Sequence, residues 1–192
     1  MTSFATWADL AVLLKRTFTE AEKDQAEQLL AGATARIRAI TDQWITEVVN
    51  DVWITDAPRD RVLWLPQRPV TAVSSVKVDG VTVTDWRLRG SRLIRAAAWA
   101  GTCDFDVPPE VEVTYTHGIP AGNEKLDLAK DACLAFAAEA RSNPDGLKSE
   151  RIDDYARAFG DGAGSPRWAG TEKALRDQYG RRPKTGSVNT AA

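Results

Sequence analysis

Apolar and polar residues alternate most regularly near the middle of the chain. Two runs, separated by Asp79-Gly80, carry valines at every second position: Val76 and Val78, then Val81 and Val83. Asp-Gly accepts the positive φ angles of a two-residue type I′ turn, whose twist matches the strands it joins. Side chains alternate between the two faces of a strand, so such a turn puts all four valines on one face. The pattern predicts a β-hairpin here.

Helical periodicity flanks this stretch on both sides. Thr19 and Glu22 form a capping box, after which apolar residues recur three and four apart to about Thr41. Asn123 is a suitable N-cap for a second long helix, which runs to about Ser142. Shorter helices are expected after Thr6 and after Thr171. The predicted fold is mainly α with a β insertion (α+β): a bundle of about four helices interrupted by a small antiparallel sheet.

The β insertion is expected over about residues 61–117. It contains a short strand at 61–65, a second hairpin over 86–95 around Gly90-Ser91, and an alternating strand at 110–116. Residues 44–58 mix apolar β-branched residues with Asn and Asp, and we interpret them as an irregular or β-like connection. Pro66 and Pro69 cannot donate hydrogen bonds to a sheet, so they favour an edge or a bend.

Length and charge suggest one domain with a tail. The chain has 192 residues, which fits a domain at 1–180 and a flexible C-terminal arm at 181–192 that is rich in small and polar residues. No apolar run is long enough to cross a membrane. From residue 167 onward, six basic and two acidic residues give a charge of +4. Because the whole chain has a net charge of −2, residues 1–166 carry −6. A basic arm on an acidic body is often an interaction segment, and a solvated terminal tail is the competing interpretation.

Candidate chemistry is sparse. The single histidine, His117, lies at a strand end and fits a turn residue better than a catalyst. Asp104 with Asp106, and Asp153 with Asp154, fit solvated loop acids better than a cation site, because calcium loops need more oxygen ligands at set spacing. Cys133 lies in an apolar helical run, which is typical of a buried thiol. We therefore expect no enzyme activity, no catalytic residues, no cofactor and no metal site.

Four arginines suggest an alternative function. The 86–95 ribbon carries Arg87, Arg89, Arg92 and Arg95, and together with the basic C-terminal segment it could contact nucleic acid phosphates. The acidic body argues against a nucleic-acid-binding module, as does the lack of a helix-turn-helix, zinc finger or aromatic–basic platform. Salt bridges between subunits, or solvent exposure, are competing interpretations.

The order and spacing of these segments resemble a known protein family. The capped helix from Thr19 is followed by Leu65-Pro66-Gln67-Arg68-Pro69-Val70-Thr71, then the Gly-turn hairpin, then Val111-Glu112-Val113-Thr114-Tyr115-Thr116-His117-Gly118-Ile119-Pro120 and an Ala-rich helix. This arrangement is similar to the head–tail connector (adaptor) proteins of long-tailed phages, especially those of actinobacterial hosts. The resemblance covers most of residues 6–180.

The resemblance implies a structural virion protein of the neck. Family members form a ring, expected to be dodecameric, beneath the portal protein, where they extend the channel for double-stranded DNA without reading its sequence. The implied partners are other copies of the chain, the portal, and a tail-proximal neck protein (stopper) or tail terminator, with no membrane. The implied location is the virion neck, with the host cytoplasm during assembly.

Two sets of residues become candidate sites on this basis. The family's C-terminal segment commonly reaches the portal, which makes Arg181, Arg182, Pro183 and Lys184 candidates for portal docking. The proline segment and the valine hairpin are candidates for the subunit interface: Pro66, Arg68, Pro69, Val76, Val78, Val81 and Val83.

Overall fold

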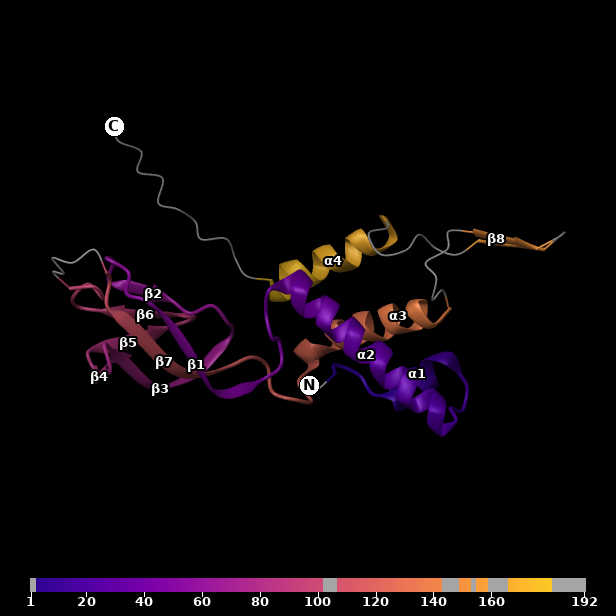
Figure 1. Ribbon diagram of the computed structural model, residues 1–192, viewed down its shortest axis with the longest axis horizontal. Helices are drawn as coiled ribbons and strands as arrows, with labels where there is room; N and C mark the ends of the chain where they lie inside the picture. Colours follow the sequence, from indigo (N-terminus) through magenta and orange to yellow (C-terminus); the bar gives the residue numbers. More distant parts are fainter. Residues whose placement is uncertain (1–2, 102–106, 143–148, 153–154, 159–165, 181–192) are drawn as a thin grey trace, which may run out of the picture.

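The computed structural model describes residues 3–101, 107–142, 149–152, 155–158 and 166–180. Helices gather in one body and most strands in another, and the two bodies lie end to end (Figure 1). The chain passes from the helical body into the β body after residue 41 and returns after residue 117. The predicted class, a helical bundle with an antiparallel β insertion, is confirmed.

Four helices form the helical body. They are α1 (Trp7–Leu14), α2 (Glu20–Thr41), α3 (Asp127–Ser142), which follows a short 3-10 turn η1 (Glu124–Leu126), and α4 (Pro166–Tyr179). The predicted capping box at Thr19 is present, α1 begins with a second capping box at Thr6, and Asn123 caps η1. The last helix begins earlier than predicted, so Thr171 lies inside it; proline is well suited to a first helical position.

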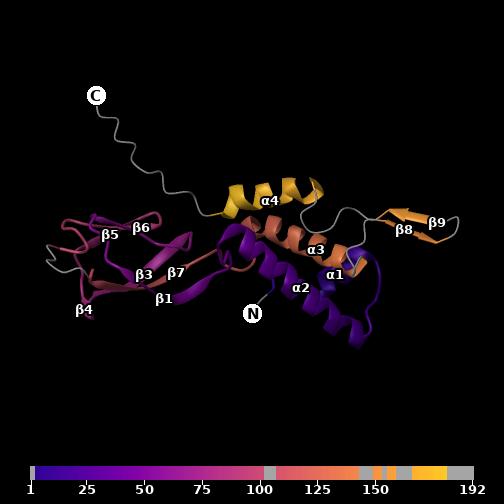
Figure 2. The ribbon, with the colours of Figure 1, turned by 45° about the horizontal axis from the view of Figure 1, so that its top comes forward.

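The core of the helical body is built from small residues on α2 and α3 around a few large ones. Ala26, Ala33, Ala129 and Ala137 are buried there, and Figure 2 shows α2, α3 and α4 running alongside one another. Arg36 links these three helices: its guanidinium stacks 4.3 Å from the Phe136 ring centre and pairs with Glu172 at 2.9 Å. Cys133 is buried as predicted, and burial raises the pKa of its thiol. No described helix is long and apolar enough to span a bilayer.

Two antiparallel sheets form the β body. The first has the order β1-β7-β3-β4 and the second the order β2-β6-β5. Their bounds are β1 (Val48–Asp56), β2 (Val62–Trp64), β3 (Val70–Val78), β4 (Val81–Thr82), β5 (Trp86–Arg89), β6 (Arg92–Arg95) and β7 (Glu110–His117). A separate hairpin, β8 (Ser149–Ile152) and β9 (Tyr155–Ala158), lies between α3 and α4 in sequence.

The predicted hairpins form, but they belong to two sheets and not to the single small sheet that was predicted. Val78 pairs with Val81 across the Asp79-Gly80 turn, and both turn residues have positive φ. The second hairpin forms over the predicted residues, with Leu88 opposite Leu93. However, that hairpin pairs with β2 instead of extending the valine hairpin, whose neighbour is β7.

The ambiguous segment 44–58 contains a regular strand. β1 spans Val48–Asp56, so the β region begins earlier than residue 61. A register shift interrupts its pairing with β7 between Val48 and Asp51, where Asn50 has a φ of 54°. Such a bulge adds a residue to one strand and breaks the strict alternation of side chains. This break, together with apolar residues on both faces, hides the strand in the sequence pattern.

The two sheets pack face to face as a sandwich. One buried cluster joins them, with Leu63 and Leu93 from the three-stranded sheet and Val76, Val113 and Tyr115 from the four-stranded sheet. Trp99, from the segment after β6, is 2% exposed and completes this core. Since alternate residues of each strand point inward, the remaining residues of the strands form two outer faces on opposite sides of the sandwich.

Candidate functional site: the junction and the outer faces of the sandwich

The Gln43 side chain, just after α2, hydrogen-bonds the proline segment, residues 66–69. Its side chain is 3% exposed, and its Nε2 donates to the Pro66 carbonyl at 2.9 Å. Its Oε1 accepts from the Arg68 backbone N–H at 2.8 Å. One buried amide side chain thus pairs with a part-buried acceptor and a part-buried donor of a segment in which Pro66 and Pro69 cannot donate sheet hydrogen bonds. Pro66, Arg68 and Pro69 are therefore placed by contacts within the subunit.

The two connections between the bodies cross at Gly118. Thr46 forms an isolated bridge with Ile119, the Glu47 N–H donates to the Ile119 carbonyl at 3.0 Å, and the Gly118 N–H donates to the Pro69 carbonyl at 2.8 Å. Gly118 has a φ of 93°, and a Cβ there would lie 2.2 Å from the Thr46 carbonyl oxygen. Only glycine fits this crossing, so the joint between the two bodies is a close backbone contact.

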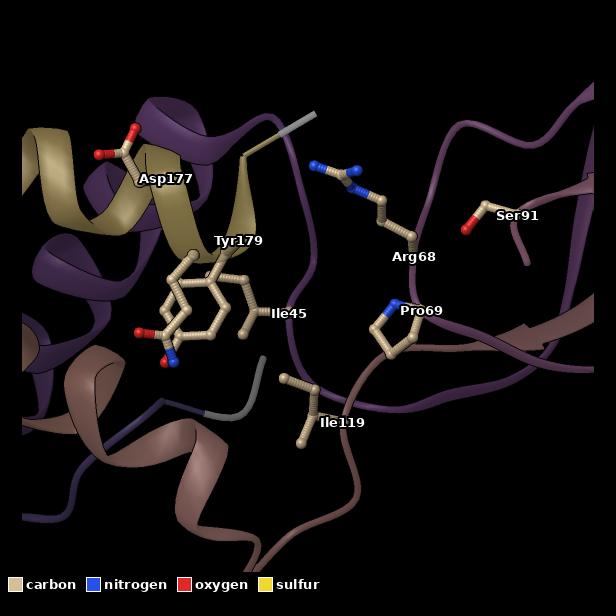
Figure 3. Close-up of a pocket in the computed structure, with 8 residues that line it drawn as sticks. Ile45, Arg68, Pro69, Ser91, Ile119, Asp177 and Tyr179 are labelled. Carbon is tan, nitrogen blue, oxygen red and sulfur yellow. The ribbon is translucent and has the colours of Figure 1, made fainter. Parts of the chain in front are cut away.

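A pocket of about 250 Å³ opens between the end of α4 and the β body. Figure 3 shows Arg68 and Pro69 approaching from the β body and Tyr179 from α4. The Tyr179 hydroxyl donates to the Lys125 carbonyl, which also accepts from Gln178 Nε2 at 3.3 Å. Burial raises the pKa of Tyr179. The remaining lining residues are Ile45, Ser91, Ile119 and Asp177.

The predicted portal-docking residues lie outside the described residues. Arg181, Arg182, Pro183 and Lys184 follow Gly180, which comes directly after pocket residue Tyr179. The last described residue, Gly180, therefore lies beside this pocket. The acids Asp104, Asp106, Asp153 and Asp154 also lie outside the described residues.

The predicted interface valines have different surroundings. Val76 is 1% exposed and faces Val113 in the sandwich core, so its side chain is not at the surface. Val78 and Val83 are half-buried and pack against the same core, whereas Val81 is 67% exposed at the hairpin tip. Folding of the subunit itself provides the partner surface for most of this hairpin. Only Val81 keeps a largely exposed apolar side chain.

The four arginines that could contact nucleic acid lie on two different faces of the three-stranded sheet. Arg95 lies on the inner face, the same face as Leu93. Its guanidinium binds Asp85 through Nε and Nη2 at 3.0 Å and stacks 5.1 Å from the Trp99 ring centre. The other three lie on the outer face with Trp64, over whose ring the Arg92 guanidinium sits at 5.3 Å. We call this outer surface the arginine face; its members are Val62, Trp64, Arg87, Arg89, Arg92 and Ile94.

The outer face of the four-stranded sheet was not predicted as a site. Val52 and Ile54 of β1 are 55% and 53% exposed, and the cross-strand register places Ile54 opposite Glu112 and Asp56 opposite Glu110. Lys77 of β3 pairs with Glu112 at 2.7 Å. We call this surface the acidic face; its members are Val52, Ile54, Asp56, Glu110 and Glu112. Val52 and Ile54, two residues apart, could have indicated this face from the sequence. They were missed because residues 44–58 were interpreted as an irregular or β-like connection.

His117 is a buried structural residue. It is 1% exposed, its Nε2 lies 3.0 Å from Asp51 Oδ2, and its ring packs 5.0 Å from that of Tyr115. Burial, helped by the nearby Asp51 carboxylate, raises the pKa of Tyr115 to about 12, so its hydroxyl stays protonated at neutral pH. Within the described ranges, no group of three or more His, Cys, Asp or Glu residues is positioned to hold a metal ion.

The fold is shared with solved neck structures of gene transfer agent (GTA) particles. The chain aligns with a chain in the neck of an empty GTA particle computed with C6 symmetry, at a TM-score of 0.58, 21% identity, and coverage of 93% of this chain and 91% of the other. It aligns with a chain in the virion of a native GTA particle at a TM-score of 0.53 and 22% identity, with coverage of 89% of this chain and 86% of the other. A chain in the neck of the native particle computed with C12 symmetry aligns at a TM-score of 0.51 and 19% identity, with coverage of 84% of this chain and 85% of the other. By sequence, the chain matches no family model and no curated protein.

Proposed function

We propose that this chain is a structural neck protein of a phage-like particle, which forms a ring between portal and tail. The likeness to the GTA neck structure carries this proposal, because it covers 93% of this chain and 91% of the other and therefore includes both bodies. Structures of such necks with C6 and C12 symmetry support a ring of several copies. The role is architectural, so the chain needs no catalytic centre.

The ring extends the DNA channel from the portal toward the tail. Its partners are the portal on one side and a stopper or tail terminator on the other, and it is added in the host cytoplasm before the virion is complete. An acidic body supports this function, because it neutralises few phosphates and lets double-stranded DNA pass without specific binding. The proposal includes a connector role of the actinophage kind.

The basic arm that begins after Gly180 docks on the portal. Arg181, Arg182 and Lys184 add three positive charges within four residues, and the arm has no run of apolar residues that would need burial in the subunit. A basic segment of this kind is often an interaction arm.

The test is binding to the portal encoded in the same gene cluster. Wild-type protein mixed with purified portal should co-migrate in size-exclusion chromatography with light scattering, and cryo-electron microscopy should show a ring on one end of the portal. Absence of binding at micromolar concentrations would contradict the proposed function. Virions lacking this protein should have filled heads without attached tails.

Two variants separate docking from folding. Arg181→Glu with Arg182→Glu and Lys184→Glu should weaken portal binding and leave the melting temperature unchanged, because the arm lies beyond α4. The matched control reverses three exposed charges elsewhere, at Lys15, Arg59 and Lys125. If the control weakens portal binding as much as the arm variant does, net charge and not the arm controls docking.

A further inference from the structure

We propose that the acidic face of one copy binds the arginine face of the next copy. This inference rests on the proposed ring and identifies the surfaces that build it. The two faces belong to different sheets of one sandwich, whose inner residues share a single core. They therefore point in opposite directions from the same subunit, as a head-to-tail contact requires.

The charges of the two faces are opposite. The arginine face has three guanidinium groups, from Arg87, Arg89 and Arg92. The acidic face has three carboxylates, of which Glu112 pairs with Lys77. Asp56 and Glu110 have no ion-pair partner among the described residues, and neither do Arg87 and Arg89. Each face thus leaves charges for which the other provides the counter-charge.

The apolar residues of the two faces also match. Val52 and Ile54 are each more than half exposed on the acidic face, and Trp64 is 48% exposed on the arginine face. Large apolar side chains grouped on a surface and bordered by charge are typical of protein interfaces, where tryptophan and arginine are enriched. Contact between the faces would remove Ile54 and Trp64 from water and place the charged residues around them.

The charges of the two faces favour a head-to-tail contact with a second copy over an isologous dimer or DNA. An isologous dimer would bring arginine face against arginine face, or acid against acid, and like charges at an interface cost affinity. A heterologous contact leaves one free face at each end and closes only through rotation into a ring. Duplex DNA would satisfy the arginines through phosphate but would leave the acidic face and its valine and isoleucine uncovered.

Charge reversal tests the pairing. Asp56→Arg with Glu110→Arg reverses the acidic face, and Arg87→Glu with Arg89→Glu reverses the arginine face; all four side chains are exposed, so the fold should persist. Sedimentation velocity over a concentration series should show self-association of the wild type that weakens at high salt. Each reversed variant should associate at least about 100-fold more weakly, because like charges then meet.

The chain with both faces reversed is the decisive variant. It should assemble again with itself, since opposite charges meet once more, and should fail to mix with wild-type chains. Asp24→Arg with Glu27→Arg, on the exposed side of α2, is the control for added positive charge and should assemble normally. Circular dichroism of each variant confirms that its fold is retained.

The contradicting outcomes are distinct. Assembly that is unaffected by reversal of either face overturns this pairing while leaving portal binding, and so the proposed function, intact. A wild-type chain that stays monomeric up to about 1 mM also overturns it, because the faces would then bind too weakly to act alone. Salt-dependent binding of DNA that disappears in Arg87→Glu with Arg89→Glu, without loss of self-association, assigns the arginine face to nucleic acid instead.

Discussion

Gly118 offers the sharpest test of how the two bodies are joined. Replacing it with alanine puts a Cβ 2.2 Å from the Thr46 carbonyl oxygen and 2.9 Å from the Glu47 Cα, both of which belong to backbone. The chain must therefore move at the crossing. It must also hold alanine at a φ of 93°, a region that L-residues avoid.

The expected loss follows from these two effects. An alanine at positive φ costs about 1–3 kcal/mol, and displacing the Thr46–Ile119 crossing weakens two backbone hydrogen bonds worth about 1 kcal/mol each. The sum is about 3–5 kcal/mol, which for a chain of this size corresponds to roughly 6–20 °C in Tm. Urea denaturation monitored by circular dichroism measures the free energy directly, provided the unfolding is two-state.

Two other glycines provide matched controls. Gly122 has a φ of 79° but nothing within 4 Å of an added Cβ, so Gly122→Ala should cost only the backbone strain, about 1–3 kcal/mol. Gly32 lies in α2 with open space around it, so Gly32→Ala should stabilise the chain by up to about 1 kcal/mol. If Gly118→Ala costs no more than Gly122→Ala, the close backbone crossing does not hold the bodies together.

Two further predictions concern single side chains. Gln43→Ala should lower the free energy of unfolding by about 2–3 kcal/mol, because it leaves the Pro66 carbonyl and the Arg68 N–H without their buried partner; a loss in urea denaturation smaller than that of Gln28→Ala, on the exposed side of α2, would contradict this. The hydrogen bond from Lys130 holds the pKa of Asp9 at about 2, below the ordinary value of 3.8. Because the folded pKa is the lower one, this stabilisation is full above about pH 4 and is lost as the pH falls toward 2. Asp9→Asn should remove about 1 kcal/mol at neutral pH, after allowance for its partial exposure, and flatten the pH dependence of the urea midpoint in that range; an unchanged slope would refute the assignment.

The sequence was sufficient wherever local chemistry decides the structure. Asp79-Gly80 and Gly90-Ser91 specify their turns through backbone conformations that neighbouring strands accept, and both hairpins form around the predicted turns. The capping boxes at Thr6 and Thr19 fix where two helices begin, because each satisfies backbone N–H groups within four residues. These interactions span short distances along the chain, so the residues themselves carry the information.

Only the tertiary structure decided which strands meet and which side chains stay exposed. Val76 and Val81 are chemically alike and share one face of the hairpin, yet Val76 lies in the core between the two sheets and Val81 stays exposed at the hairpin tip. Trp64 and Arg92 come together only because β2 pairs with β6 across a long separation in sequence. Alternation along a strand shows that two faces exist, but long-range pairing determines which face is buried, and this placed the arginine face and the acidic face on opposite sides of one sandwich.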